Sequence, residues 1–82
     1  MTFEHKYIMY LKQKGRCYYC GSRFSIRKMT KDHLVPKGKG GSDSLSNYVL
    51  ACYPCNHEKG DMLYNEYMKL ITSRNELQLN KT

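Results

Sequence analysis

Four cysteines in two pairs are the residues of this 82-residue chain whose spacing most clearly indicates chemistry. Each pair has the pattern Cys-x-x-Cys, first at Cys17 and Cys20 and again at Cys52 and Cys55. Two such turns that face each other supply four thiolates, which is the ligand set of a tetrahedral structural zinc ion. Because protein ligands then fill every coordination position, we expect this zinc ion to stabilise the fold and not to catalyse a reaction.

Two other interpretations of the cysteines remain open at this level. Two disulfides would require an oxidising compartment, but residues 1–15 carry charge throughout and lack an apolar segment of signal-peptide length. A redox-active pair would be expected at a helix start in a thioredoxin-like unit, where one pair is enough. No apolar run approaches the ~20 residues that span a bilayer. We therefore expect structural zinc and a cytoplasmic protein of a bacterial or phage-infected cell, with no membrane partner.

The dipeptide Asp32-His33 lies between the two cysteine pairs and is followed by Pro36 and a basic, glycine-rich segment. Hydrolysis of a phosphodiester needs a base to activate water and a cation to neutralise charge on the phosphate. A histidine suits the base, because its ordinary pKa of ~6.5 lets it accept a proton near neutral pH. Carboxylate and carboxamide oxygens suit a hard divalent ion. Taken alone, such a dipeptide is more often a structural pair than a reactive one.

The charge of the chain favours a polyanionic partner. Fourteen Lys and Arg residues against seven Asp and Glu residues give a formal net charge of +7. Neutralising phosphates with such a surface releases condensed counterions, so a polyanion that carries phosphates would gain from binding it. Lys37 and Lys39 lie in the glycine-rich loop and could follow a phosphate strand. The alternatives are charge that serves solubility and a loop that is merely solvated.

The elements that must position these residues are short. Phe3, Tyr7 and Leu11 recur at a spacing of four, which predicts an amphipathic helix over residues 3–14, closed by Gly15. Strands are predicted over residues 29–35 and 47–52, with a loop over 37–44 between them, and a second helix over 62–79. We expect the two terminal helices to cover a small central unit. A chain this short buries only ~60% of the surface that it exposes when unfolded. We therefore expect a structural metal ion to add to the stability of the fold.

In chain order the sequence holds Cys-x-x-Cys, DHLVP, a Gly-Gly pair, Asn47, Cys-x-x-Cys and NHEKG. This order and spacing resemble the HNH endonuclease family, in the branch whose ββα-metal core is braced by a four-cysteine zinc site. The resemblance runs from about Cys17 to Gly60 and does not cover the terminal helices. It implies an α+β fold and one domain over residues 1–82, with a core at about 17–60 flanked by helices over 3–14 and 62–79.

The resemblance also implies a role for each matched residue. His33 would be the general base that activates water, and Asp32 and Asn56 would hold a catalytic divalent ion, Mg²⁺ or Mn²⁺. Asn47 would brace the loop and orient the base. Asn56 stands where the motif ends in histidine, so the chain is an HNN-type variant. His57 is the alternative ligand, but one residue further along a helix is rotated ~100° away, and we expect Asn56 to bind the ion.

The implied function is a metal-dependent endonuclease that hydrolyses DNA phosphodiester bonds. Lys37, Lys39, His57 and Lys59 are the expected DNA contacts, although Lys59 could instead brace the fold. One copy would nick one strand, and cleavage of both strands would need a second copy in a homodimer or a larger targeting partner. Two alternatives are a non-catalytic, zinc-braced nucleic-acid-binding module and a zinc-stabilised protein-interaction domain.

Overall fold

The structure, a computed structural model, describes residues 1–79, with side chains described through residue 75. The helices and strands, in order, are α1 (Phe3–Lys12), β1 (Met29–His33), β2 (Tyr48–Cys52), α2 (Tyr53–Lys59) and α3 (Tyr64–Leu79). Three 3-10 turns join them: η1 (Ile26–Lys28), η2 (Lys37–Lys39) and η3 (Leu45–Asn47). The α+β class expected from the sequence is confirmed. The loop between the two strands is longer than the predicted loop. It contains η2 and η3, and η3 leads directly into β2.

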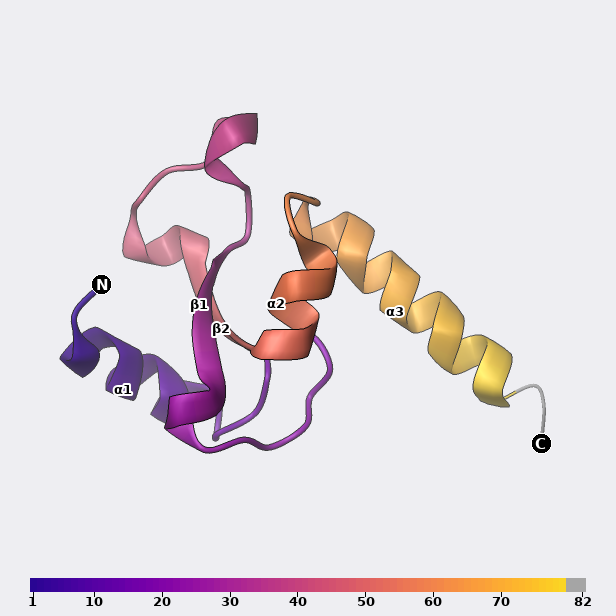
Figure 1. Cartoon of the computed structure of the whole chain (residues 1–82), viewed down its shortest axis with the longest axis horizontal. Helices are drawn as coiled ribbons and strands as arrows, with labels where there is room; N and C mark the ends of the chain where they lie inside the picture. Colours follow the sequence, from indigo (N-terminus) through magenta and orange to yellow (C-terminus); the bar gives the residue numbers. More distant parts are fainter. Residues whose placement is uncertain (80–82) are drawn as a thin grey trace.

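The centre of the molecule is the antiparallel hairpin of β1 and β2, with α1 and α2 on opposite sides of it (Figure 1). The register pairs Asp32 with Val49 and His33 with Tyr48. Because successive side chains of a strand point to opposite faces, Asp32 and His33 face different sides of the hairpin. Every residue of β2 is buried, which agrees with a strand covered on both faces.

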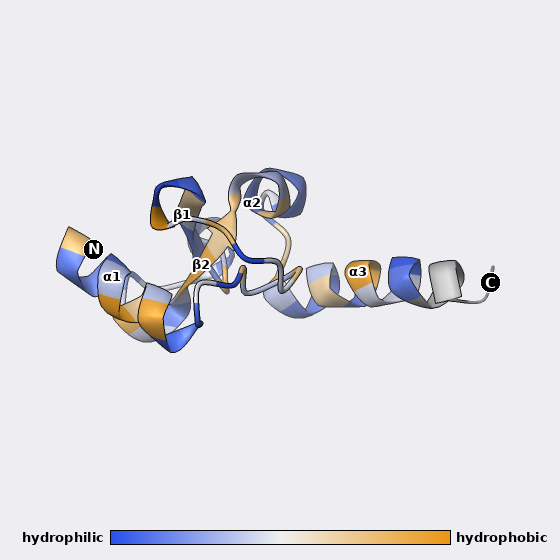
Figure 2. Ribbon diagram, turned by 90° about the horizontal axis from the view of Figure 1, so that it is seen from below, coloured by the Kyte–Doolittle hydropathy of each residue, from blue (hydrophilic) through white to orange (hydrophobic). Residues whose placement is uncertain are grey.

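The helix α1 is in the predicted place, but it turns a different face inward. Within Phe3–Lys12 no residue is buried, and Phe3, Tyr7 and Leu11 are exposed, Phe3 to 69%. Figure 2 shows apolar and polar patches alternating around this helix. Two polar anchors set its orientation: the Tyr10 hydroxyl donates to the Phe24 carbonyl at 2.6 Å, and the Gln13 amide bonds both backbone groups of Leu50 in β2 at 2.9 Å. The predicted helix is therefore present, but the apolar residues that predicted it, Phe3, Tyr7 and Leu11, lie on its exposed side.

The helix α3 is attached to α2 by contacts from Tyr67 to Arg74, and it extends away from the hairpin (Figure 1). Tyr67 is its buried anchor, and the Tyr67 hydroxyl donates to Glu58 of α2 at 2.8 Å. Arg74 bonds both carboxylate oxygens of Glu58, at 2.8 and 2.9 Å. These contacts fix the angle between α2 and α3. Among residues 1–79 no helix combines the length and the apolar character that crossing a membrane requires.

Candidate active site

The four cysteines meet at one point of the structure. All four thiols are free of disulfides, and their sulfur atoms lie within 4.8 Å of one another. A tetrahedron of sulfurs, each ~2.3 Å from zinc, has sulfur–sulfur edges of about 3.8 Å. The Sγ atoms of Cys20 and Cys52 are 3.9 Å apart, which matches such an edge and exceeds a disulfide bond. The cluster therefore fits a structural zinc ion.

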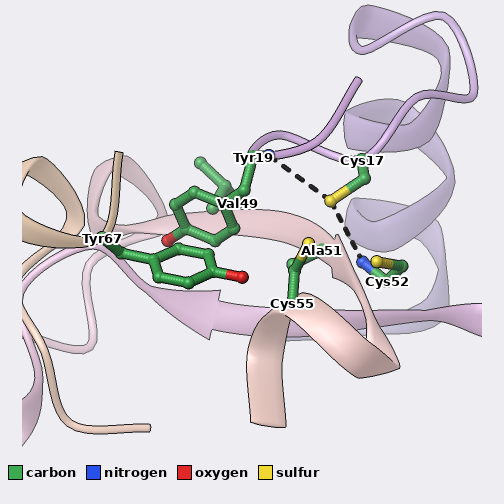
Figure 3. Packing of buried hydrophobic residues seen from close by; sticks show 7 residues of the cluster. All are labelled: Cys17, Tyr19, Val49, Ala51, Cys52, Cys55 and Tyr67. Carbon is green, nitrogen blue, oxygen red and sulfur yellow. Dashed lines mark hydrogen bonds between the residues drawn. The ribbon is translucent and has the colours of Figure 1, made fainter. Parts of the chain in front are cut away.

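Backbone amides point at the sulfur of Cys17, and the neighbouring Cys20 thiol is the one that ionises more easily than usual. The amide groups of Tyr19 and Cys52 each donate to Cys17 Sγ at 3.4 Å (Figure 3). Hydrogen bonds to a charged group favour its charged form. At Cys20 burial opposes ionisation, but hydrogen bonds with Ser22, Cys17 and Cys55 together outweigh it and lower the pKa of this thiol to about 7. The Cys20 thiol is thus already disposed to bind metal as a thiolate.

The second cysteine pair forms where β2 ends and α2 begins. Cys52 is the last residue of the strand, and Cys55 lies in the first turn of the helix, so a zinc ion bound by both would fix the angle between these elements. Tyr19 and Tyr67 pack edge to face beside the cluster, with ring centroids 5.2 Å apart (Figure 3). Burial raises the pKa of the Cys55 thiol, so a metal ion is needed to hold it as a thiolate.

Asp32 lies inside the molecule, on the α2 side of the hairpin. Asp32 is only 6% exposed, and its Oδ2 atom accepts a hydrogen bond from the Tyr19 hydroxyl. The ammonium group of Lys59 lies 3.1 Å from the same oxygen. Burial and the neighbouring Asp32 carboxylate both raise the pKa of Tyr19, so this hydroxyl keeps its proton and acts as a donor. The Asp32 carboxylate therefore forms an ion pair with Lys59 and also accepts a hydrogen bond from Tyr19.

Lys59 is buried, which is incompatible with the DNA contact expected for it. The residue is 1% exposed, and besides Asp32 its ammonium bonds the carbonyl oxygen of His33 at 2.9 Å. The lysine therefore holds the backbone at the end of β1 in place from α2. Of the two roles considered for this residue, bracing the fold is the one that the contacts support.

Replacing Lys59 with methionine should lower the free energy of unfolding by about 3–5 kcal/mol, because it leaves the buried Asp32 carboxylate without its counter-charge. Urea unfolding of the zinc-loaded protein measures this change. Lys69→Met, at an exposed position of α3, is the control and should change little. A double variant that also carries Asp32→Asn should recover part of the loss. Equal stabilities of Lys59→Met and the wild-type protein would contradict the role of the pair.

His33 lies on the other face of the hairpin, at the end of β1 and with its side chain 24% exposed. Its ring packs against the ring of Tyr48, with centroids 4.5 Å apart at a tilt of 52°. His33 Nε2 lies 3.3 Å from Oδ1 of Asp43, a loop residue that the sequence analysis did not single out. Asp43 also accepts hydrogen bonds from Lys37 and Tyr48, and these bonds, with that to His33, hold the pKa of its carboxyl below the ordinary value.

Asn47 closes the loop between the two strands. Its side-chain oxygen accepts from the Val35 amide at 3.0 Å, and its amide nitrogen donates to the carbonyl groups of Val35 and Ser42 at 3.0 and 2.9 Å. Gly41 is required in this closure, because a Cβ atom there would collide with the Val35 carbonyl. The loop that carries Lys37 and Lys39 is thus tied to the base of the hairpin, and both lysines are exposed.

Asn56 and His57 project from α2 at the edge of an open hollow of about 360 Å³. The amide nitrogen of Asn56 donates to Thr30 Oγ1 at 2.7 Å and to the Lys31 carbonyl at 3.2 Å. His57 is exposed and stacks on Tyr53, with ring centroids 5.6 Å apart at 17°. Asn56 therefore faces the hairpin while His57 faces outward, as their difference in helix rotation requires.

The structure divides the residues singled out from the sequence between two sides of the hairpin. Asp32, Asn56 and Lys59 lie on the α2 side, since Asn56 bonds Thr30, which shares a strand face with Asp32. His33 lies on the opposite side with the loop that Asn47 closes. Asp43 is the residue that sequence reasoning missed. The only signal for it was an acidic residue within the segment bounded by the cysteine pairs.

Comparison with known proteins gives two matches to this chain. Residues 17–70 match a family model described as HNH endonuclease. The chain is also 35% identical over 57 residues to the CRISPR-associated endonuclease Cas9 of Corynebacterium diphtheriae. The aligned segment is 68% of this chain but 5% of that relative. The matched region contains both cysteine pairs, the hairpin, α2 and the start of α3.

Proposed function

Because this chain belongs to the HNH endonuclease family, we propose that it is a metal-dependent endonuclease that hydrolyses phosphodiester bonds in DNA. The observation that carries the proposal is the placement of His33 within the matched region. A partly exposed imidazole lies at a strand end, beside a loop that the Asn47 amide closes through three hydrogen bonds. An imidazole held in this way is suited to act as a general base near neutral pH.

In the proposed reaction, His33 accepts a proton from a water molecule as its oxygen attacks the phosphorus atom. The bond from phosphorus to the 3′ oxygen then breaks, and the 3′ oxygen takes a proton from solvent. The products are a 5′-phosphate and a 3′-hydroxyl. A positioned general base contributes about 10²–10⁴-fold to the rate of such a step.

Asp32 and Asn56 are the residues that would hold a catalytic divalent ion, Mg²⁺ or Mn²⁺. Both described side-chain partners of Asp32 contact Oδ2, which leaves Oδ1 as the oxygen available to an ion. The amide nitrogen of Asn56 is used in bonds to Thr30 and Lys31, so its side-chain oxygen is the atom available as a ligand. Two oxygen ligands with coordinated water suit Mg²⁺, which keeps several of its waters. When bound, the ion neutralises charge on the phosphate and the leaving oxygen.

DNA is the proposed substrate, and the charge around His33 supports this. Lys31 lies two residues before His33 on the same strand face, with its ammonium 5.1 Å from the Tyr48 ring centroid. Lys37 and Lys39 are exposed on the adjoining loop, and His57 is exposed on α2. One catalytic unit cuts one strand, so we propose nicking by a single copy and double-strand cleavage only with a second copy or a larger partner.

The competing function is a zinc-braced module that binds nucleic acid without cutting it, and the ion pair of Asp32 with Lys59 favours it, because a lysine already neutralises this carboxylate. An end-labelled DNA duplex separates the two. The zinc-loaded protein with Mg²⁺ or Mn²⁺ should produce fragments with 5′-phosphate and 3′-hydroxyl ends. DNA that is bound but stays intact with either ion would support the binding module.

A further inference from the structure

We propose that Asp43 is a positioning residue for His33, which fixes the imidazole ring so that Nδ1 is the nitrogen free to accept a proton. This inference rests on the proposed function, because it assigns a partner to the general base. Its starting point is the contact of His33 Nε2 with Asp43 Oδ1 at 3.3 Å. An ionised carboxylate only accepts hydrogen bonds, so Nε2 must be the nitrogen that carries the proton. The neutral ring then has its lone pair on Nδ1.

The carboxylate of Asp43 is itself fixed by two further donors. The Lys37 ammonium donates to Oδ2 at 2.7 Å, and the Tyr48 hydroxyl donates to Oδ1 at 2.9 Å. Oδ1 is therefore shared by His33 and Tyr48, which are paired across the hairpin. Tyr48 also packs its ring against the imidazole at 4.5 Å, so the histidine is restrained through its edge and through its face.

The backbone that carries Asp43 is also restrained. Asn47 donates to the carbonyl oxygen of Ser42, the residue just before Asp43. On its other side Ser44 caps η3, accepting from the Ser46 amide at 3.3 Å. The side chain of Asp43 is 59% exposed, yet its position is set by neighbours on both sides along the chain. Asn47 therefore acts on His33 in part through Asp43.

The opposite role for Asp43 would be to occupy the place of a substrate phosphate. The Asp43 carboxylate contacts an imidazole, an ammonium group and a phenol hydroxyl, and a bound anion would make the same kinds of contact. The two roles predict opposite effects. Removing a positioning residue slows cleavage without changing DNA affinity, whereas removing an occupant of the phosphate site tightens DNA binding and speeds cleavage.

The variants Asp43→Ala and Asp43→Glu in the zinc-loaded full chain test the proposal, with Asp61→Ala as the control that removes an exposed acid elsewhere. Asp43→Ala should lower the maximal single-turnover rate of cleavage about 10- to 100-fold, the scale expected for a misplaced catalytic group. Its dissociation constant for a DNA duplex should stay within about twofold of wild type. Asp43→Glu should restore part of the rate, and Asp61→Ala should match wild type.

A spectroscopic readout separates positioning from a merely structural effect. In ¹H–¹⁵N spectra recorded at low temperature, wild type and Asp43→Glu should show a His33 Nε2 proton protected from exchange by its hydrogen bond. The signal is assigned by its loss in His33→Gln and should be absent in Asp43→Ala, with zinc content unchanged. A signal that persists in Asp43→Ala, an unchanged rate, or faster cleavage with tighter binding would overturn the proposal. If wild-type protein cuts no DNA, the proposed function fails, and the signal still decides whether Asp43 holds His33.

Discussion

Replacing His33 with alanine should slow DNA cleavage by about 10²–10⁴-fold, with zinc content and DNA affinity unchanged, because the variant loses the general base and keeps the binding surface. The side chain contributes no zinc ligand, and its main partners, Tyr48 and Asp43, are also bonded to each other. The measurement is the single-turnover rate on a labelled duplex at saturating protein.

Two controls separate the loss of a base from damage to the fold. His5→Ala removes an exposed histidine from α1 and should cut DNA at the wild-type rate. Imidazole added to the buffer should restore part of the activity of His33→Ala, since it can enter the space that the side chain leaves and accept the proton. A His33→Ala protein as active as wild type would exclude this histidine as the base.

Replacing Cys52 with serine should abolish zinc binding and unfold the domain. Cys52 is 2% exposed and joins β2 to α2, so its sulfur connects the central hairpin to the helix that carries Asn56 and Lys59. Structural zinc supplies apparent binding free energies of about 10–16 kcal/mol at neutral pH. The net stability of a folded domain is about 5–15 kcal/mol. Losing the zinc site therefore removes an amount comparable with the whole stability.

Circular dichroism and metal analysis of Cys52→Ser check this prediction. The variant should bind less than one equivalent of zinc and show no cooperative thermal transition, and a chelator should have the same effect on wild-type protein. Ser22→Ala removes a hydroxyl next to Cys20 without removing a ligand, so it should keep both zinc and fold. A Cys52→Ser protein that stays folded without zinc would show that the cluster is not what holds the domain together.

The spacing of the cysteines and the order of the polar residues after them were sufficient to predict the centre of this molecule. The meeting of the two cysteine pairs was predicted from their matching Cys-x-x-Cys spacing, since four thiolates complete a tetrahedral zinc site. Both strands were predicted to within two residues at each end because their apolar, β-branched and aromatic residues are bounded by turn residues. The strand β1 ends early since the Val35 amide bonds the side chain of Asn47 and leaves the sheet.

The features that sequence could not predict depend on single polar contacts between distant residues. The orientation of α1 is set by Gln13, whose partner Leu50 is far along the chain, while the apolar spacing of Phe3, Tyr7 and Leu11 indicates a different inward face. The burial of Lys59 likewise depends on its contact, from α2, with Asp32 of β1. Periodicity reports which residues share a helix face, but it does not report such pairs.

Asp43 shows the same limit for the candidate site. Acidic residues are common in polar loops, and nothing in the spacing of Asp43 along the chain links it to His33. Its three donors come from β1, η2 and β2, and they converge only when the loop is closed by Asn47 and turned at Gly41. The role of such a residue follows from the folded geometry alone.

The most direct test of the central claim is the conversion of supercoiled plasmid to open circles by the zinc-loaded wild-type protein. The account predicts nicking that requires added Mg²⁺ or Mn²⁺ and that is lost in His33→Ala at equal zinc content and equal DNA binding. Plasmid that is bound equally by both proteins and stays supercoiled with every divalent ion tried would contradict the assignment of this chain as a nuclease.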